Sequence, residues 1–263
     1  MLKNLFLVLK GFLIGIGKIV PGVSGAVLAM TFGIYDKGID CIVNFFKKPK
    51  SNLKFLFFVG LGVVLGIVLF SKIINYSIKY YYFITMLFFI GLISGGLPSL
   101  MKEIKIKNYY LIMVSFLLMT LLSLNNVNNI YLLKNNYIDY IIFLLGGIFE
   151  GIGTIVPGIS GTALLMILGI YNIVIEMISS IIIDFRLIIS FGVGMIVSII
   201  LISLLINIVL KKYKSNTYCF ILGIILSTIL VMFIKTFSVS FTILDFLIGL
   251  ILFISGFIIS NKL

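Results

Sequence analysis

The sequence contains no histidine and no tryptophan, and it has only two cysteines and four prolines among its 263 residues. Without histidine, the chain has no imidazole for acid–base catalysis, metal ligation or a phosphohistidine intermediate. Cys41 and Cys219 lie in unrelated surroundings without the spacing of metal ligands, which argues against a disulfide or a redox role. We therefore expect neither a metal site nor another cofactor.

Acidic residues are also scarce, with 8 Asp and Glu against 20 Lys and Arg, which gives a net charge of +12. The basic residues are spread along the loops, a pattern that indicates membrane orientation and not nucleic-acid binding. The longest polar stretches, 36–54 and 125–137, are too short to hold a core of their own. The sequence therefore predicts no soluble domain and no nucleic-acid partner.

Hydrophobic residues make up 62% of the chain, and the mean hydropathy is +1.30, far above that of a soluble globular protein. Several of the apolar runs are long enough to cross a bilayer as helices. We predict an all-α polytopic membrane protein. The first residues, MLKNLFLVLKG, resemble the charged start of a signal peptide, but no Ala-x-Ala site follows, so we expect this segment to be retained.

One segment of the chain occurs twice. Residues 11–40, GFLIGIGKIVPGVSGAVLAMTFGIYDKGID, match residues 147–176, GIFEGIGTIVPGISGTALLMILGIYNIVIE, at a constant offset of 136 and without a gap. More than half of the pairs are identical. Between 15–25 and 151–161 the copies differ only at Lys18/Thr154 and Val23/Ile159. A Pro-Gly-x-Ser-Gly set repeated within hydrophobic sequence is typical of transporters built from two related halves.

The distribution of basic residues decides between two topologies. If each motif segment is a re-entrant hairpin that enters and leaves by one face, fourteen basic residues lie on one side and five on the other. If each segment crosses completely, the division is nine against ten, with Lys18 left out as intramembrane. Only the hairpin topology obeys the positive-inside rule, and it places both termini in the cytoplasm of a multi-pass protein of the cell membrane.

Three crossings per half is an odd number, so the second half must be inserted upside down relative to the first. The predicted fold is thus two inverted repeats, each a re-entrant helical hairpin plus three transmembrane helices, with an outer linker at 125–137. The first repeat, 1–124, has its hairpin at 5–35 and its spans at 53–71, 80–100 and 109–124. The second repeat, 138–263, has its hairpin at 138–175 and its spans at 187–210, 217–234 and 244–260.

The repeated motif forms the tips of the two hairpins, which are expected to meet near the middle of the bilayer. Proline ends the incoming half-helix, glycine permits the reversal, and serine is a natural N-cap for outgoing helices at about 25–35 and 161–171. Such tips present backbone N–H groups, hydroxyls and a positive helix end, which suits phosphate or carboxylate. The candidate substrate-binding residues are Pro21, Gly22, Ser24, Gly25, Pro157, Gly158, Ser160 and Gly161.

Intramembrane charges add further candidates. Lys18, three residues before Pro21, can neutralise part of a phosphate, and Thr154 is its equivalent in the repeat. Glu150 is a candidate for coupling transport to protons or another ion, because ionisable residues inside a membrane are often functional. A plainer interpretation leaves Lys18 snorkelling and Glu150 near the outer interface. Tyr35 and Tyr171 are expected to be interfacial anchors, and Asp36 is expected to be solvated.

PGVSG–AVLAMTFGIYD and PGISG–TALLMILGIYN, with FFIGLISGGLP between them, resemble the bacterial and archaeal PopT polyprenyl-phosphate transporters, long catalogued as domain of unknown function 368. The resemblance covers nearly the whole chain. It implies a flippase that returns undecaprenyl phosphate from the outer to the inner leaflet for cell-wall synthesis, with the tip residues as its site. Family members often continue the first motif with Gly-Thr, where this chain has Ala26 and Val27; Thr162 keeps a hydroxyl in the second motif.

Two other functions remain open at this point. A transporter or channel for a small anion could use the same tips with a closed aqueous vestibule. A membrane enzyme such as a polyprenyl-diphosphate phosphatase is disfavoured, because the chain has no histidine, a single arginine (Arg186) and no Arg/Asp-rich catalytic set. We therefore expect a transporter and not an enzyme.

Overall fold

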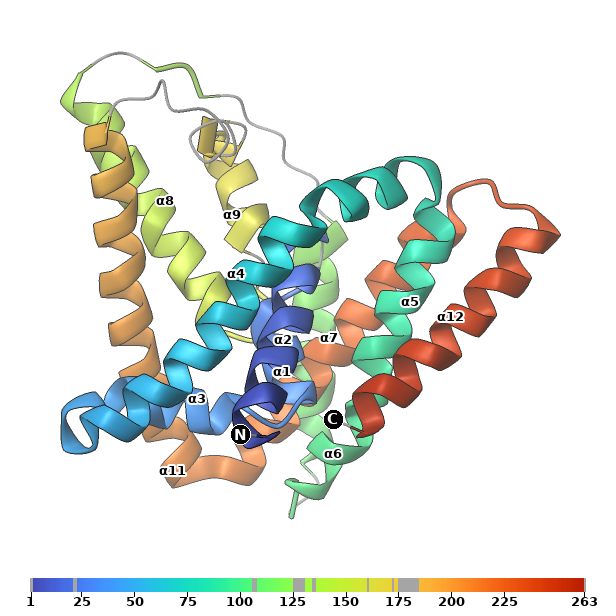
Figure 1. Ribbon diagram of the computed structural model, residues 1–263, viewed down its shortest axis with the longest axis horizontal. Helices are drawn as coiled ribbons and strands as arrows, with labels where there is room; N and C mark the ends of the chain where they lie inside the picture. Colours follow the sequence, from blue (N-terminus) through green and yellow to red (C-terminus); the bar gives the residue numbers. More distant parts are fainter. Residues whose placement is uncertain are drawn as a thin grey trace.

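Figure 1 shows the computed structural model, in which every regular element of the described residues is helical. The structure describes residues 2–20, 23–105, 108–124, 131–133, 136–159, 161–171, 173–174 and 185–262. The all-α prediction is confirmed for these residues.

The first half of the chain contributes a helix, a short broken segment and three further helical stretches. Their bounds are α1 (Leu2–Ile19), α2 (Gly25–Thr31), α3 (Tyr35–Val43), η1 (Phe45–Lys47), α4 (Pro49–Tyr80), α5 (Tyr82–Gly95), α6 (Leu97–Lys102) and α7 (Tyr109–Leu124).

The second half follows the same order. Its helices are α8 (Tyr137–Ile155), α9 (Gly161–Leu168), α11 (Phe185–Phe237) and α12 (Ile243–Lys262). The backbone of Tyr213 is non-helical, at φ −133° and ψ 43°, so α11 is two helices joined across a kink. These two parts occupy the sequence predicted as separate spans at 187–210 and 217–234.

Five helical stretches of the described chain are long and apolar enough to cross a membrane. They are Pro49–Tyr80, Tyr82–Lys102, Tyr137–Ile155, Phe185–Phe237 and Ile243–Lys262, and Tyr109–Leu121 is a shorter apolar helix. Large hydrophobic side chains remain exposed along them, among them Val68 at 66% and Ile251 at 65%. Such exposure is unfavourable in water but expected against lipid, and the chain is therefore a multi-pass membrane protein.

The outgoing arms of the two motif segments are shorter than the sequence predicts. Helix α2 ends at Thr31 and α9 ends at Leu168, where helices to residues 35 and 171 were expected. The reason is a glycine with positive φ just beyond each end, Gly33 at 65° and Gly169 at 76°. Left-handed glycine stops a helix at its C-terminus, and these two glycines stand 136 residues apart.

Close backbone packing recurs in the two halves. Helix α1 lies along α4 so closely that a Cβ on Gly11 would collide with the carbonyl of Val59. Small residues allow this approach between membrane helices. Each such contact has a counterpart between α8 and α11: Gly11 with Val59 corresponds to Gly147 with Phe191, Gly62 with Val8 to Gly194 with Leu144, and Gly15 with Val63 to Gly151 with Met195. The contacts match at offsets of 136 in α1/α8 and 132 in α4/α11.

The remaining helices pack across the two halves. Gly91 of α5 lies against the carbonyl of Phe253 in α12, and Gly223 of α11 lies against that of Ile112 in α7. Gly91 and Gly223 are again 132 residues apart. In each of these two helix pairs, one helix therefore comes from the first half of the chain and the other from the second half.

The corresponding elements of the two halves run in opposite directions in Figure 1. Helix α1 begins near the lower end of the view, whereas α8 begins at the upper end, and the second motif segment returns upward through α9. The start of α1 and the end of α12 lie toward the same, lower end.

Candidate functional site

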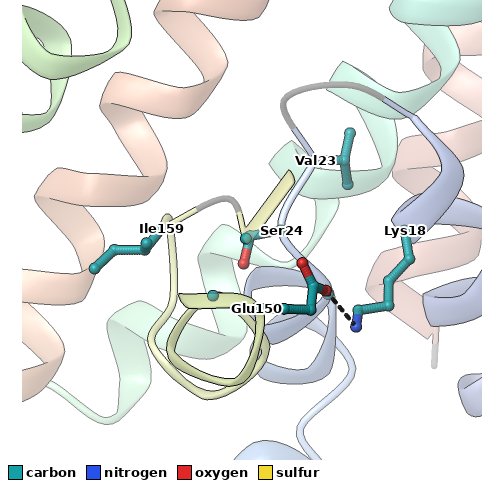
Figure 2. Close-up of a pocket in the computed structure, with 8 residues that line it drawn as sticks. Lys18, Val23, Ser24, Glu150 and Ile159 are labelled. Atoms are coloured by element: carbon teal, nitrogen blue, oxygen red, sulfur yellow. Dashed lines mark ion pairs between the residues drawn. The ribbon is translucent and has the colours of Figure 1, made fainter. Parts of the chain in front are cut away.

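Residues of the two motif segments line one cavity, which we call the central cavity. Figure 2 shows the labelled residues that line it: Lys18, Val23 and Ser24 from the first segment, and Glu150 and Ile159 from the second, with the Ile159 side chain turned away from Lys18 and Glu150. Gly25, Gly153 and Gly161 complete its lining. Residues of both expected tips, more than 130 positions apart in the sequence, therefore line the same cavity.

Lys18 and Glu150 form an ion pair across the two halves. The Nζ of Lys18 lies 3.5 Å from Oε1 of Glu150, and the two side chains are 23% and 18% exposed. The same Nζ donates a hydrogen bond of 3.1 Å to Oγ1 of Thr154, whose hydroxyl donates to the backbone oxygen of Glu150. Lys18 and Thr154, equivalent positions of the repeat, thus contact each other directly.

Two buried polar atoms of the site have no hydrogen-bond partner: Oγ of Ser24 and Oε2 of Glu150. Ser24 is only 3% exposed, and a buried hydroxyl without a partner is unfavourable. Ser24 stands at the N-cap position of α2, as predicted, but its side chain makes no capping hydrogen bond. The capping role was wrong: the hydroxyl lines the cavity and is available to a ligand there.

The cavity is small, about 20 Å³, which is room for roughly one water molecule. Glycine is required at two lining positions, because a side chain there would collide with the site residues or crowd them. A Cβ on Gly161 would collide with the carboxylate of Glu150, and one on Gly25 would lie 3.1 Å from Cγ of Lys18. A headgroup larger than water therefore requires the two tips to move apart.

Gly158 of the second tip requires glycine for two reasons. Its φ is +81°, and a Cβ there would overlap the Ile224 side chain of α11. Pro157 beside it is buried. Of the other candidates, Pro21, Gly22 and Ser160 lie outside the described residues, and so does the side chain of Thr162.

Sequence reasoning missed the role of Tyr35, which was expected at a membrane interface. Tyr35 is 5% exposed, and its hydroxyl donates a hydrogen bond of 2.8 Å to the backbone oxygen of Ile155. That oxygen belongs to the last turn of α8, where carbonyls lack helical partners. No sequence signal pairs residues 120 positions apart.

Asp36 was expected to be solvated, but it joins α3 to the other half of the chain. It accepts a hydrogen bond of 2.8 Å from the hydroxyl of Tyr218. Lys214 lies 3.5 Å from Asp36 and 2.7 Å from Glu103. The cluster lies beside the kink of α11, so it ties the first motif segment to that bend.

Within the described ranges, no group of three or more His, Cys, Asp or Glu side chains is placed to hold a metal ion. The polar side-chain groups that line the central cavity are instead the ammonium group of Lys18, the carboxylate of Glu150 and the hydroxyl of Ser24, which are groups that bind anions or exchange protons.

These features define a class: a helical multi-pass membrane protein with a polar site where two repeated segments meet. Residues 14–244 match the model of the VCA0040-like family, described as undecaprenyl phosphate translocase-like. The chain belongs to this family.

Two relatives carry the name polyprenyl-phosphate transporter. The protein of Staphylococcus aureus is 28% identical over 97% of this chain and 94% of its own length. That of Vibrio cholerae is 27% identical over 84% of this chain and 75% of its own length. No solved structure matches the chain. The resemblance seen in the sequence is therefore confirmed.

Proposed function

We propose that this protein transports a polyprenyl phosphate, undecaprenyl phosphate in the first instance, from the outer to the inner leaflet of the cell membrane. The carrier lipid would thereby be returned for cell-envelope synthesis. The observation that carries the proposal is the central cavity, in which both motif copies surround the ammonium group of Lys18 and the unbonded hydroxyl of Ser24. Phosphate oxygens accept hydrogen bonds from such donors. The family and the names of both relatives agree with this substrate.

The phosphate must exchange places with Glu150. Lys18 is paired with that carboxylate, and the cavity has no room for a phosphate while the pair is closed. As the tips separate, the phosphate replaces Glu150 as the partner of Lys18. The hydroxyls of Ser24, Ser160 and Thr162 are further hydrogen-bond donors to it. The first-turn N–H groups of α2 and α9, which lack partners within their helices, complete the site.

Glu150 is the proposed coupling residue. Lys18 is the charged side chain that faces it in the described part of the site. Once the phosphate has taken Lys18, an ionised Glu150 would be left without a counter-ion beside a second negative charge. Taking up a proton removes that cost, so a proton would enter the site with each phosphate.

The proposed architecture is the pair of inverted repeats, 1–124 and 138–263, joined by an outer linker. It is supported by the matched glycine contacts of the two halves and by the opposite directions of α1 and α8. The basic residues favour cytoplasmic termini. Rocking one half against the other would expose the tips to each leaflet in turn.

The test is leaflet-resolved transport of polyprenyl phosphate in proteoliposomes. Lys18→Gln should abolish most transport and weaken binding of the lipid phosphate by about 1–3 kcal/mol, the strength of a hydrogen bond to a charged group. Lys72→Gln, which removes an exposed lysine of α4, is the matched control and should transport at the wild-type rate. The flux of inorganic phosphate is measured in the same vesicles.

Two results would contradict the proposal. One is a fast flux of inorganic phosphate without lipid transport, which indicates a small-anion transporter. The other is release of inorganic phosphate from a lipid diphosphate by the purified protein, which indicates an enzyme.

A further inference from the structure

A second cavity adjoins the central one. It has a volume of about 200 Å³ and lies among α1, α2, α3 and α4. Lys18 and Gly25 line both cavities, so the two cavities lie on either side of these residues. We name this second cavity the apolar groove.

The lining of the groove is nearly all hydrocarbon. Its walls include Ile14, Ala29, Ile39, Phe55 and Val59. Its polar groups are already engaged, because Thr154 bonds to Lys18 and Glu150, and the hydroxyl of Tyr35 donates to Ile155. Beyond Lys18 the groove therefore offers nothing to a polar ligand and suits a hydrocarbon chain.

The size of the groove fits a short length of such a chain. An engineered apolar cavity of about 150 Å³ in another protein binds benzene, with its six carbons. A groove of about 200 Å³ therefore has room for roughly one or two five-carbon isoprene units.

Larger side chains stand at two of the equivalent positions in the described part of the second half. Ala29 and Gly38, which line the groove, correspond to Leu165 and Val174 at the repeat offset of 136. Both Leu165 and Val174 are buried in a cluster with Phe191 packed against them. Phe191 corresponds to Val59 through the matched helix contacts. Among the described residues, small side chains therefore line the groove in the half that carries the lysine, and larger buried ones stand at the equivalent positions of the other half.

We propose that the apolar groove binds the first isoprene units of the prenyl chain while Lys18 holds the phosphate. This inference rests on the proposed function and adds the part of the site that recognises the lipid. The phosphate of a prenyl phosphate is attached directly to its first isoprene unit. Its headgroup and first carbons therefore need two adjoining compartments, one polar and one apolar, which is how the cavities meet at Lys18.

The test fills the groove with the side chains of the second half. Ala29→Leu and Gly38→Val are combined, and Gly60→Val in α4 is the matched control. A Cβ on Gly38 or Gly60 has no atom within 4 Å, and Gly60 does not line the groove. Binding of two water-soluble probes, methyl phosphate and geranyl phosphate, is measured on purified protein in nanodiscs, with empty nanodiscs subtracted.

Wild-type protein and Gly60→Val should bind geranyl phosphate more tightly than methyl phosphate by about tenfold or more, because burying two methylene groups already suffices for that ratio. The filled variant should lose most of this preference while still binding methyl phosphate. Lys18→Gln should weaken both probes. An unchanged preference in the filled variant overturns the groove and leaves the proposed function standing. Binding of the two probes that does not depend on Lys18 overturns both the groove and the proposed function.

A second measurement needs no variant. A farnesyl phosphate with a diazirine on its first isoprene unit is photolysed with wild-type protein, and the labelled peptides are identified by mass spectrometry. Labelling at 35–42 and 55–63 is expected. Labelling confined to lipid-facing helices such as α12 would refute the groove.

Discussion

Replacing Glu150 with glutamine should increase the affinity for a lipid phosphate. Glutamine keeps the shape of the side chain but removes the charge that occupies Lys18 at 3.5 Å. A phosphate bound to the far side of Lys18 would lie roughly 7 Å from the carboxylate, where two unit charges repel by about 2 kcal/mol at an effective dielectric of 20. Because both side chains are partly exposed, we reduce this by about half. The expected gain is about five- to tenfold in affinity.

The assay is equilibrium binding of a labelled polyprenyl phosphate to purified protein, with transport measured in parallel. Glu150→Gln should bind more tightly yet transport more slowly, because the lysine no longer exchanges partners and release is slowed. Its transport should also lose any response to an imposed proton gradient. Tyr137→Phe, also in α8, controls for a general change in that helix, since Tyr137 is 72% exposed and does not line the cavity.

Weaker binding in Glu150→Gln, together with normal folding by gel filtration, would refute the reasoning. It would mean that the carboxylate positions Lys18 for the phosphate and does not compete with it.

Three further experiments test other parts of the structure. Gly158→Val should abolish transport, because its φ is positive and the new side chain would collide with Ile224. Tyr35→Phe should destabilise the protein by about 0.5–1.5 kcal/mol, the net worth of one hydrogen bond, seen as a lower thermal midpoint. In a cysteine-free chain, Lys48→Cys should react with a membrane-impermeant maleimide only from the cytoplasm, and Ser240→Cys only from outside.

Each of these has a contrary result. Normal transport by Gly158→Val would show that the second tip is not the site. An unchanged thermal midpoint for Tyr35→Phe would show that water replaces the hydrogen bond to Ile155. Labelling of both cysteines from the same side would contradict the proposed topology.

Much of the architecture was predictable because a membrane imposes strong and local rules on sequence. A chain that crosses lipid must satisfy its backbone within helices, so apolar runs such as 244–260 predicted a helix that the structure has as Ile243–Lys262. The duplication was visible because Pro-Gly-x-Ser-Gly keeps its order and spacing. From it followed the expectation that 21–25 and 157–161 meet, and residues of both ranges do line one cavity.

Short-range details were less predictable than they looked. Ser24 has the residue type and position of an N-cap, but its hydroxyl lies in the cavity without a capping bond. Gly33 ends α2 early although the apolar sequence continues. Both outcomes depend on what lies beside the segment, and propensity does not describe that.

The sequence by itself determined the helices, the repeat and the candidate tips, because each follows from hydropathy and spacing along the chain. Only the tertiary structure decided that Lys18 pairs with Glu150 and that Tyr35 closes the end of α8. It also decided that space lies open beside Ala29, whereas Leu165 at the equivalent position is buried. These contacts join helices from different parts of the chain, so they depend on the rotation and depth of each helix against its neighbours. Hydropathy shows that a residue avoids water, but it does not show whether lipid or another helix covers that residue.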